Sequence, residues 1–343
     1  MQEPKFIEIE QALAHYAHGE IPVVDVRSEK EFEKGHIPGA INVPLLNNTH
    51  RHLVGCCYKE QGQAKAIELG YALVGPLFPE IQQKALAATS KRTIILHCWR
   101  GGLRSKITAG LLAEVGFEVW MVNGGYKKWR NTWLSELGRH RQLRVVSGLT
   151  GSGKTGLLYA LKAKGQQMID LEGIAHHRGS AFGGLGLPEQ PTQEQFENVL
   201  CKSLWEISSG VLYVESESRM IGRLRIPDPF FEQILTAPRI EVKRSYAFRE
   251  GEILRIYGVF PGEQLKEKTL QLNKRMGSEQ TQEAVAALES GDRIKWLEIL
   301  LHYYDKNYLH HHQKIAKQEI NVVLTPSDDD EEVVEQILKL EWN

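Results

Sequence analysis

Short apolar runs alternate with helix-like stretches over the first 125 residues. Four of the runs are rich in β-branched residues and occupy positions 21–27, 40–43, 92–98 and 118–125. Segments of helical composition, such as SEKEFEKG (28–35) and RSKITAGLLAEVG (104–116), lie between or beside them. Strands that are apolar on both faces and alternate with helices are typical of a parallel sheet. This pattern predicts an α/β domain.

The same alternation starts again near residue 143. LRVVSG (143–148), QQMIDLE (166–172) and GVLYVESES (210–218) predict the strands of a second α/β domain. From residue 262 the pattern is mainly helical, with one more strand candidate at INVVLT (320–325). The acidic run 327–332 suits the positive end of a helix that begins there. We therefore expect domains at 1–138 and 139–343, the second with a helical C-terminal part.

Length and composition agree with two globular domains. A chain of 343 residues exceeds one ordinary core, and its residues are 42% hydrophobic and 25% charged. Its four cysteines form no CxxC pair and no zinc-type spacing: Cys56, Cys57, Cys98 and Cys201. No apolar run reaches the length of a membrane span. We expect a cytoplasmic protein with reduced thiols, no certain metal site and no membrane partner.

Charge is unevenly spread although the net charge is −1. Residues 126–144 contain six Lys or Arg and one Glu, and residues 219–255 contain eight basic and five acidic residues. The first stretch lies at the predicted domain boundary, where it could attract a polyanion. Ordinary solvent-exposed charge is the alternative for both stretches and the better explanation for the second.

Cys98 ends the third predicted strand, and the carboxyl ends of strands are where open α/β sheets place their sites. A helix predicted from about Ser105 and the loop residues before it would favour a thiolate, with a pKa of roughly 3.5–7.5. That loop holds two glycines and two arginines: Arg100, Gly101, Gly102 and Arg104. An inert buried cysteine is the alternative, but this loop favours a nucleophile.

The neighbours of Cys98 carry weaker signals. His97 should point to the opposite face of the sheet, so we interpret it as structural. For Trp99, stacking on a base and packing against the loop both remain open. The other three cysteines have no comparable loop.

A second glycine-rich loop follows the first predicted strand of the second domain and precedes a helix. Its sequence GLTGSGKT (148–155) is a complete phosphate-binding motif, with Gly148, Gly151, Ser152, Gly153, Lys154 and Thr155 as the candidate residues. Four acidic residues lie at the ends of the next two predicted strands: Asp170, Glu172, Glu215 and Glu217. We favour Asp170 and Glu215 as a Mg²⁺ ligand or general base, with a solvated strand end as the alternative for each.

Three segments together resemble a rhodanese domain. They are DVRSEKEFEKGHIPGAINVP (25–44), the Cys98 loop, and NGGYKKW (123–129). The spacing from Cys98 to Arg104 would also fit a phosphatase-like loop, but the flanking strings make the rhodanese resemblance specific. It implies that Cys98 carries sulfur or selenium, with Arg104 as its catalytic partner.

Further strings extend the resemblance to the whole chain. DLEGIAHHRGSAFGGLG (170–186), VESESRMIG (214–222) and VGCCYKEQG (54–62) resemble the tRNA 2-selenouridine synthase family. The chain departs from that family at Cys56-Cys57, where a small hydroxyl residue is expected at one position. A thiol role there stays open.

The resemblance implies a transferase that acts on 2-thiouridine at the tRNA wobble position. It would transfer a geranyl group from geranyl diphosphate to sulfur and then replace the S-geranyl group with selenium from selenophosphate, which a selenophosphate synthetase supplies. The P-loop would hold the diphosphate, with Mg²⁺ as a candidate ion, and the Cys98 loop would serve the selenium step. No tightly bound cofactor is expected, and apolar residues of the P-loop domain would line a prenyl pocket.

Six basic residues are candidates for the tRNA backbone, with plain surface charge as the alternative for each: Lys127, Lys128, Arg139, Arg141, Arg178 and Arg219. Two other functions compete with the selenium transferase. One is an ATP-dependent sulfurtransferase or P-loop kinase coupled to a persulfide on Cys98. The other is a nucleotide-responsive sensor, which is the weaker alternative because two intact catalytic loops indicate turnover.

Overall fold

The computed structural model describes residues 4–207, 209–315 and 321–340. The chain divides into two compact units, of which the first comprises Met1–Glu136 and Glu197–Glu206. The second comprises Leu137–Phe196 and Ile207–Asn343. The sequence predicts a boundary at residue 138 and assigns all later residues to the second domain, so it misses the return of residues 197–206 to the first unit.

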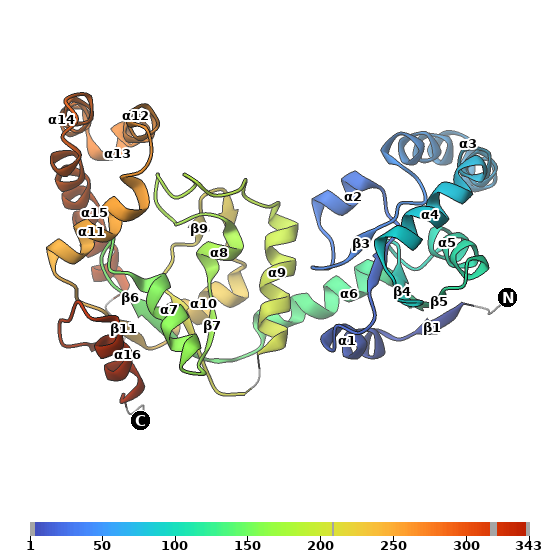
Figure 1. The fold of residues 1–343 in the computed structure, drawn as a ribbon, viewed down its shortest axis with the longest axis horizontal. Coiled ribbons are helices and arrows are strands. Elements are labelled where there is room, and N and C mark those ends of the chain that lie inside the picture. Colours follow the sequence, from blue (N-terminus) through green and yellow to red (C-terminus); the bar gives the residue numbers. More distant parts are fainter. Residues whose placement is uncertain (1–3, 208, 316–320, 341–343) are drawn as a thin grey trace. The chain divides into compact units, whose positions relative to one another are not determined.

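The first unit is a sheet covered by helices (Figure 1). Its elements are β1 (Lys5–Ile7), α1 (Ile9–Ala17), β2 (Val23–Asp25), α2 (Glu29–Lys34), β3 (Ile41–Asn42), α3 (Asn48–Val74), η1 (Gly75–Leu77), α4 (Phe78–Ala88), β4 (Thr93–His97), α5 (Leu103–Glu114), β5 (Glu118–Val122), α6 (Gly125–Leu134), η2 (Ser135–Gly138) and most of α9 (Gln193–Glu206). The strand order is β1-β5-β4-β2-β3, and all pairs are parallel. This confirms the predicted class of fold.

Side chains of β4 alternate between the two faces of this sheet. Ile94, Leu96 and Cys98 belong to a core cluster with residues of α3, α4 and α5. His97 lies on the other side of the strand, where its ring is 6.1 Å from that of Tyr126 in α6. The sulfur of Cys98 and the imidazole of His97 therefore serve different faces, as the alternation of a strand requires.

Aromatic packing explains why α9 belongs largely to the first unit. Trp205 of α9 lies 6.4 Å from Trp133 of α6 and 6.3 Å from Tyr16 of α1, measured between ring centroids. Asn198, which is buried, donates hydrogen bonds to the Tyr126 hydroxyl at 2.7 Å and to the His36 carbonyl at 3.0 Å. These contacts are long-range in sequence, so local patterning does not reveal them.

The second unit has its own parallel sheet. Its elements are β6 (Gln142–Ser147), α7 (Lys154–Ala163), β7 (Gln167–Ile169), α8 (Leu171–Ala175), β8 (Val211–Glu215), β9 (Met220–Ile221), β10 (Leu224–Arg225), α10 (Asp228–Thr236), β11 (Arg239–Glu241), α11 (Tyr246–Tyr257), α12 (Gly262–Gln271), α13 (Asn273–Met276), α14 (Ser278–Glu289), α15 (Arg293–Ile315), β12 (Asn321–Val323) and α16 (Asp330–Leu338). The strand order is β12-β11-β6-β8-β7, with a separate β9–β10 hairpin. The strand before the P-loop, β6, is therefore central.

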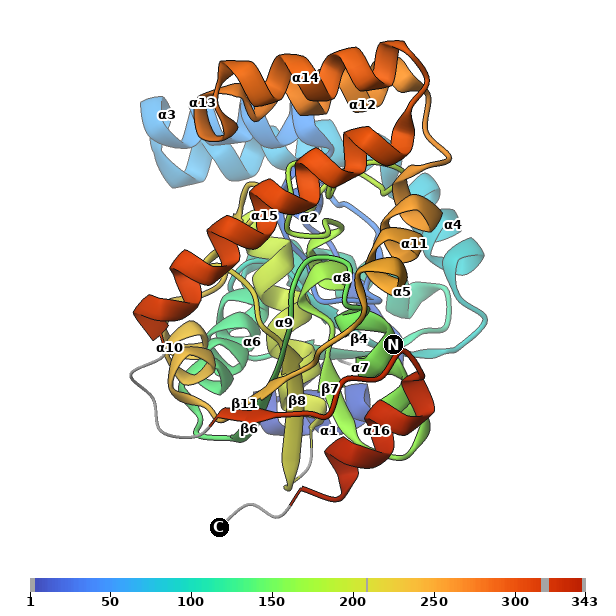
Figure 2. The same ribbon diagram turned by 90° about the vertical axis from the view of Figure 1, so that its left-hand side faces the viewer.

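Helices α12 to α15 form the helical C-terminal part, and α15 runs past the others as a long diagonal rod in Figure 2. Their apolar residues join those of α11 in one core cluster that contains Leu265, Leu297 and Trp296. The acidic run 327–332 leads into α16, as predicted. The Asp329 side chain there accepts hydrogen bonds from the amides of Glu331 and Glu332. In the described part of the chain, no helix has the length and apolarity needed to cross a membrane.

Three features of the fold differ from the sequence prediction. Strand β11 is not predicted because Arg239 and Glu241 flank its one apolar residue, yet Arg239 is buried and donates to the Ser216 hydroxyl at 2.8 Å. Strand β1 and the β9–β10 hairpin are too short to show a pattern. Strand β7 ends at Ile169 rather than at 172, because Asp170 caps α8 by accepting from the Gly173 amide.

Candidate functional site

The Cys98 loop joins β4 to α5 and is held by the segment that follows β5. The amide of Tyr126 donates to the Cys98 carbonyl at 2.9 Å, and the amide of Lys127 donates to the Trp99 carbonyl at 3.0 Å. Gly101 has φ +70, and a Cβ there would lie 2.9 Å from the Val122 carbonyl oxygen. The rhodanese-like string 123–129 is thus the clamp of the loop.

Gly125 is the tightest point of this clamp. A Cβ at this position would lie 2.5 Å from the Cys98 carbonyl oxygen and 2.6 Å from the Gly101 nitrogen, and its φ is +58. By contrast, Gly102 has φ −87 and open space around it, so only the first glycine of the predicted pair is needed for the curl.

We expect Gly125→Ala to destabilise the fold by on the order of 1–3 kcal/mol, because it adds backbone strain and a clash with the loop. Alkylation of Cys98 by iodoacetamide, followed by peptide mass analysis, should slow because the displaced loop no longer supports the thiolate. Gly102→Ala is the matched control and should change neither measurement appreciably. Equal urea unfolding of both variants would contradict the clamp.

The environment of Cys98 favours its thiolate. Burial alone would raise the pKa of the thiol, since the side chain is 4% exposed. The hydroxyl of Ser105, the charge of Arg104 and the amides of Arg100 and Ser105 act in the other direction, and the resulting pKa lies below its ordinary value. The Ser105 hydroxyl is buried and has no other partner in the described residues, which leaves it available to the sulfur.

Arg104 is half-buried and already paired. Its guanidinium donates to the two carboxylate oxygens of Glu31 at 2.7 and 3.3 Å. Glu31 is buried enough to raise the pKa of its carboxyl, but Arg104 and the nearby Arg51 outweigh this and lower it. Glu31 therefore fixes the guanidinium beside the loop, a positioning role that the sequence analysis did not find.

On the opposite face of the sheet, a buried ion pair supports the same strand ends. Arg27 donates to both oxygens of Asp25, with the shortest distance 2.6 Å, and its guanidinium lies 3.9 Å from the centre of the Tyr126 ring. The nitrogen Nδ1 of His97 is 3.8 Å from Asp25. Burial lowers the pKa of His97, so it remains neutral. These groups are within the protein core and act as structure.

Trp99 packs beside the Cys98 loop, and the other three cysteines lie in helices. Trp99 is 37% exposed, and its ring lies 5.6 Å from that of Tyr126, so it packs against the clamp and still presents a free edge. Cys57 is buried in α3, and the Cys56 sulfur lies 3.7 Å from Nε2 of His52. Cys201 is buried in α9.

The P-loop of the second unit connects β6 to α7. Gly151 and Gly153 have φ +82 and +72, and a Cβ at Gly151 would lie 2.8 Å from the Arg249 carbonyl oxygen. The amino group of Lys154 donates to the Gly148 carbonyl at 3.3 Å. Ser152 is buried, and its hydroxyl has no partner in the described residues. The loop has the backbone curl that wraps phosphate oxygens.

Arg249 of α11 supports this loop from behind. Its Nε donates to the Thr150 carbonyl at 2.8 Å, and its other nitrogens donate to Asp305 of α15 at 2.6 and 3.1 Å. The side chain is 5% exposed, and these hydrogen bonds of its guanidinium go to protein groups. We assign it a positioning role, which no motif in the sequence signals.

Three of the four candidate carboxylates gather beside the P-loop. The Thr155 hydroxyl donates to Glu172 at 3.3 Å, and the Glu172 amide donates to Glu215 at 2.9 Å. The side chains of Glu217 and Glu172 are hydrogen-bonded to each other. Asp170, which the sequence analysis favoured, instead caps α8 and accepts from the Tyr159 hydroxyl at 2.8 Å. The carboxylate next to Thr155 is thus Glu172.

Crowding of these acids changes their protonation. Burial, the charge of Glu172 and the hydrogen bond to it raise the pKa of Glu217 to about 8, although Lys154 opposes the shift. Burial and its acidic neighbours also raise the pKa of Glu215 well above its ordinary value. Like charges at this distance cannot all ionise, so the cluster holds protons near neutral pH.

The oxygen donors here fit Mg²⁺. Glu215 has a buried carboxylate oxygen, Oε2, without a hydrogen-bond partner in the described residues. Thr155 donates to the side chain of Glu172, and the backbone amide of Glu172 donates to Glu215. Mg²⁺ usually combines one or two protein oxygens with phosphate oxygens and water. Within the described ranges, no three His, Cys, Asp or Glu side chains are placed to hold a metal ion by themselves. A Mg²⁺ ion bound here would be held by Thr155 and Glu215 and would neutralise phosphate charge.

We expect Glu217→Gln to gain stability relative to the parent protein as pH rises from about 5 to 8. The folded carboxyl has a pKa of about 8 against an ordinary value of 4.5, so folding binds a proton between these values. The contribution of Glu217 to parent stability is fully present below pH 4.5 and is lost as pH rises to about 8, whereas glutamine does not titrate. Urea unfolding at four pH values measures the difference. A constant difference would show that Glu217 ionises normally.

The loop with the sequence HRGSAFG (177–183) packs against these carboxylates. Gly179 has φ +68, and a Cβ there would lie 2.8 Å from a Glu217 carboxylate oxygen. Phe182 anchors the loop in the helical core, 5.6 Å from the Trp296 ring. Arg178 donates to the Leu185 carbonyl at 2.9 Å. The loop therefore links the acids to the helical C-terminal part.

The six basic candidates differ in their surroundings. Lys127 and Lys128 are exposed on α6 of the first unit, and Arg139 is exposed in the second. The Arg141 guanidinium donates to the Arg139 carbonyl at 2.9 Å. Arg219 is paired with Asp228 and Glu232 of α10. By exposure alone, the two lysines and Arg139 are exposed, whereas the other three arginines are partly buried.

These features define a rhodanese domain joined to a P-loop domain, each with a complete loop. A rhodanese-like family model matches residues 8–132, and a model described as the tRNA 2-selenouridine synthase AAA domain matches residues 141–269. The chain belongs to the tRNA 2-selenouridine synthase family, as its relatives show.

Three relatives with that name illustrate the similarity. The one from Bdellovibrio bacteriovorus is 35% identical over 338 residues, which cover 84% of this chain and 88% of the relative. The one from Shewanella piezotolerans is 36% identical over 337 residues, covering 87% and 90%. The match to the Nitrosomonas europaea relative is 40% identical over 245 residues and spans 69% of this chain and 63% of the relative.

Proposed function

We propose that this chain converts 2-thiouridine in tRNA to 2-selenouridine in two steps, geranylation followed by selenium exchange. The observation that carries the proposal is the presence of two chemically distinct loops in one family member. One favours a thiolate at Cys98, and the other has Lys154 and a phosphate-type backbone curl. A thiocarbonyl sulfur is a poor leaving group, and alkylation converts it into a good one. Two loops then serve two steps.

In the first step, the thiouridine sulfur attacks C1 of geranyl diphosphate. A C–S bond forms, the C–O bond to the diphosphate breaks, and the nucleobase gives up its N3 proton. Lys154 and the loop amides stabilise the departing diphosphate. The acids around Glu172 provide a carboxylate that can accept the proton, since only some of them are protonated near neutral pH.

In the second step, selenium from selenophosphate replaces the alkylated sulfur at C2. The C2–S bond breaks, the C2–Se bond forms, and geranyl thiol leaves with a proton. Water removes the phosphate from the selenium donor, so the step needs no oxidant or reductant. We assign the Cys98 thiolate to this step because its loop stabilises a charged sulfur and contains no phosphate-binding glycine motif.

The test is to incubate the protein with thiolated tRNA, geranyl diphosphate and selenophosphate and to determine nucleoside masses. We expect S-geranyl-2-thiouridine with the first donor alone and 2-selenouridine after the second is added. Selenouridine formed at the full rate without geranyl diphosphate would exclude the two-step route.

A cavity beside the P-loop supports one alternative, a P-loop kinase or ATP-dependent sulfurtransferase. It measures about 480 Å³ and is lined by Leu149, Ser152, Lys243, Arg244 and Asp328, among others. A nucleoside next to the bound phosphates could occupy such a space. Calorimetric titration separates the alternatives, because the proposed function requires tighter binding of geranyl diphosphate than of ATP.

We expect tRNA binding to weaken steeply with salt, because Lys and Arg contact backbone phosphates. Replacing Lys127, Lys128, Arg139 and Arg141 together by alanine should reduce the slope of log K against log salt concentration by about 3. Filter binding at several salt concentrations measures the slope. Replacement of Lys84 and Lys339, which pair with glutamates one helical turn away, is the control and should leave the slope unchanged. Equal slopes for both variants would mean that these four residues are ordinary surface charges.

A further inference from the structure

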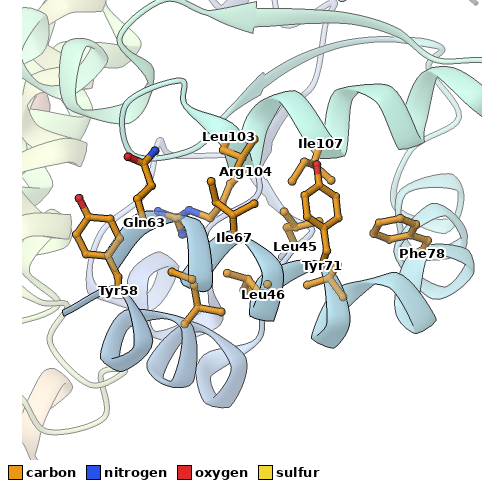
Figure 3. A pocket seen from close by; sticks show the side chains of 14 residues that line it. Leu45, Leu46, Tyr58, Gln63, Ile67, Tyr71, Phe78, Leu103, Arg104 and Ile107 are labelled. Carbon is orange, nitrogen blue, oxygen red and sulfur yellow. The ribbon is translucent and has the colours of Figure 1, made fainter. Parts of the chain in front are cut away.

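An apolar groove of about 230 Å³ lies between α3 and α5 in the first unit. Figure 3 shows its side chains in a row that runs from Tyr58 to Phe78. Helix α3 is broken at Gly62, which has φ 83, so two segments of it contribute to the lining. The lining is almost entirely apolar and includes Leu46, Val54, Tyr58, Ile67, Tyr71 and Ile107.

Several of these apolar side chains are unusually exposed. Tyr58 is 57% exposed, Tyr71 is 49% exposed and Leu103 is 45% exposed. Scattered apolar residues are normal on a protein surface, but a contiguous set around a cavity is typical of a binding site. The lining side chains are arranged in a row (Figure 3), which suits a linear hydrocarbon better than a compact ring.

One side of the groove borders the Cys98 loop. Leu103 and Arg104, the first two residues of α5, line the groove directly after that loop. The charge of the same Arg104 lowers the pKa of the Cys98 thiol. A ligand in the groove is therefore adjacent to the side chain that tunes the cysteine.

We propose that this groove holds the geranyl chain of S-geranyl-2-thiouridine while selenium replaces the sulfur. The inference rests on the proposed function. In its second step, the sulfur that leaves carries a ten-carbon apolar substituent. With the chain along α3 and α5, the sulfur and C2 of the base lie where Leu103 and Arg104 line the groove, next to the Cys98 loop. The groove is thus a site for the leaving group, separate from the P-loop.

This placement has a consequence for selectivity. Burial of the chain stabilises geranylated tRNA at the cysteine loop, whereas an unmodified thiouridine has nothing to place in the groove. The selenium step then discriminates between the two tRNAs by the apolar chain rather than by the base. A short alkyl group on the sulfur should be a much poorer substrate for the same reason.

Ile67→Trp tests the inference by filling the groove, and Ala64→Trp is the matched control. Ala64 is exposed on the same segment of α3 and does not line the groove. With purified S-geranyl tRNA and selenophosphate, we expect kcat/KM of Ile67→Trp to fall about ten-fold or more, as for other losses of apolar pocket contact. S-geranyl tRNA should accumulate in the complete reaction. The control should match the parent protein.

Three further measurements make the result decisive. Ile67→Gln, which keeps the size of the side chain, should weaken calorimetric binding of the S-geranyl-2-thiouridine nucleoside, and circular dichroism reports whether each variant is folded. With S-methyl tRNA, the parent and Ile67→Trp should react at similar low rates. Folded groove variants that exchange selenium as fast as the parent would overturn the groove assignment. A parent protein that forms neither nucleoside would instead overturn the proposed function.

Discussion

Replacing Cys98 with serine is expected to stop the reaction after geranylation. The P-loop and its carboxylates belong to the other unit, so the variant should still transfer the prenyl group. A serine hydroxyl does not ionise in a loop that only lowers a thiol pKa, and selenium exchange should fall by at least about 10³-fold. S-geranyl-2-thiouridine then accumulates and is not cleared by added selenophosphate. Nucleoside mass analysis at timed intervals measures both products.

Arg104→Ala provides a graded comparison for Cys98→Ser. The Ser105 hydroxyl and the loop amides still support the thiolate, so selenium exchange should slow less than in the serine variant. Cys201→Ser is the control. It replaces a buried cysteine of α9 and should leave the rate of selenium exchange unchanged. Exchange at the parental rate in Cys98→Ser would mean that the loop is only a scaffold and that the two units do not divide the chemistry.

The class of fold can be predicted from the sequence because parallel strands that are buried on both faces appear in it as continuous apolar runs. Strand β4, with four fully buried residues after Thr93, is such a run. Strand β11 shows where this signal fails. It is an interior strand that pairs with β12 and β6, but its buried Arg239 donates to the distant Ser216, and only the tertiary structure supplies that partner.

The site shows the same division between local and long-range signals. Both loops are predicted because glycine at positive φ and residues at fixed spacing are local requirements, as for Gly101 and Gly153. The structure places Glu172, rather than the favoured Asp170, next to the Thr155 hydroxyl, because Asp170 caps α8 as an aspartate before a helix often does. Spacing along a strand cannot distinguish these uses.

Supporting residues are missed for a related reason. Glu31 and Arg249 act through partners 73 and 99 residues away in sequence, so neither belongs to a motif. Arg219 was proposed for tRNA on charge alone, yet two acids of α10 neutralise it. Composition counts charges, whereas only the fold determines which of them are paired.

Replacing Lys154 with alanine is expected to reduce geranyl transfer by about 10²–10³-fold or more. The lysine charge holds the diphosphate and stabilises it as it departs, so its loss affects the transition state as well as binding. Among the described residues, its amino group donates a hydrogen bond to the Gly148 carbonyl at 3.3 Å, so the fold should change little. Geranylation of thiolated tRNA under saturating geranyl diphosphate gives the change in kcat, and thermal unfolding reports on stability.

Two controls give this result its meaning. Lys162→Ala removes an exposed lysine from the same helix and should leave geranylation unchanged. Supplied with purified S-geranyl tRNA, the Lys154→Ala protein should still exchange selenium, because that step uses the Cys98 loop and needs no prenyl diphosphate. Normal geranylation by Lys154→Ala would separate the P-loop from the prenyl donor and favour a nucleotide as its ligand. Loss of both steps would show that the two loops act as one site.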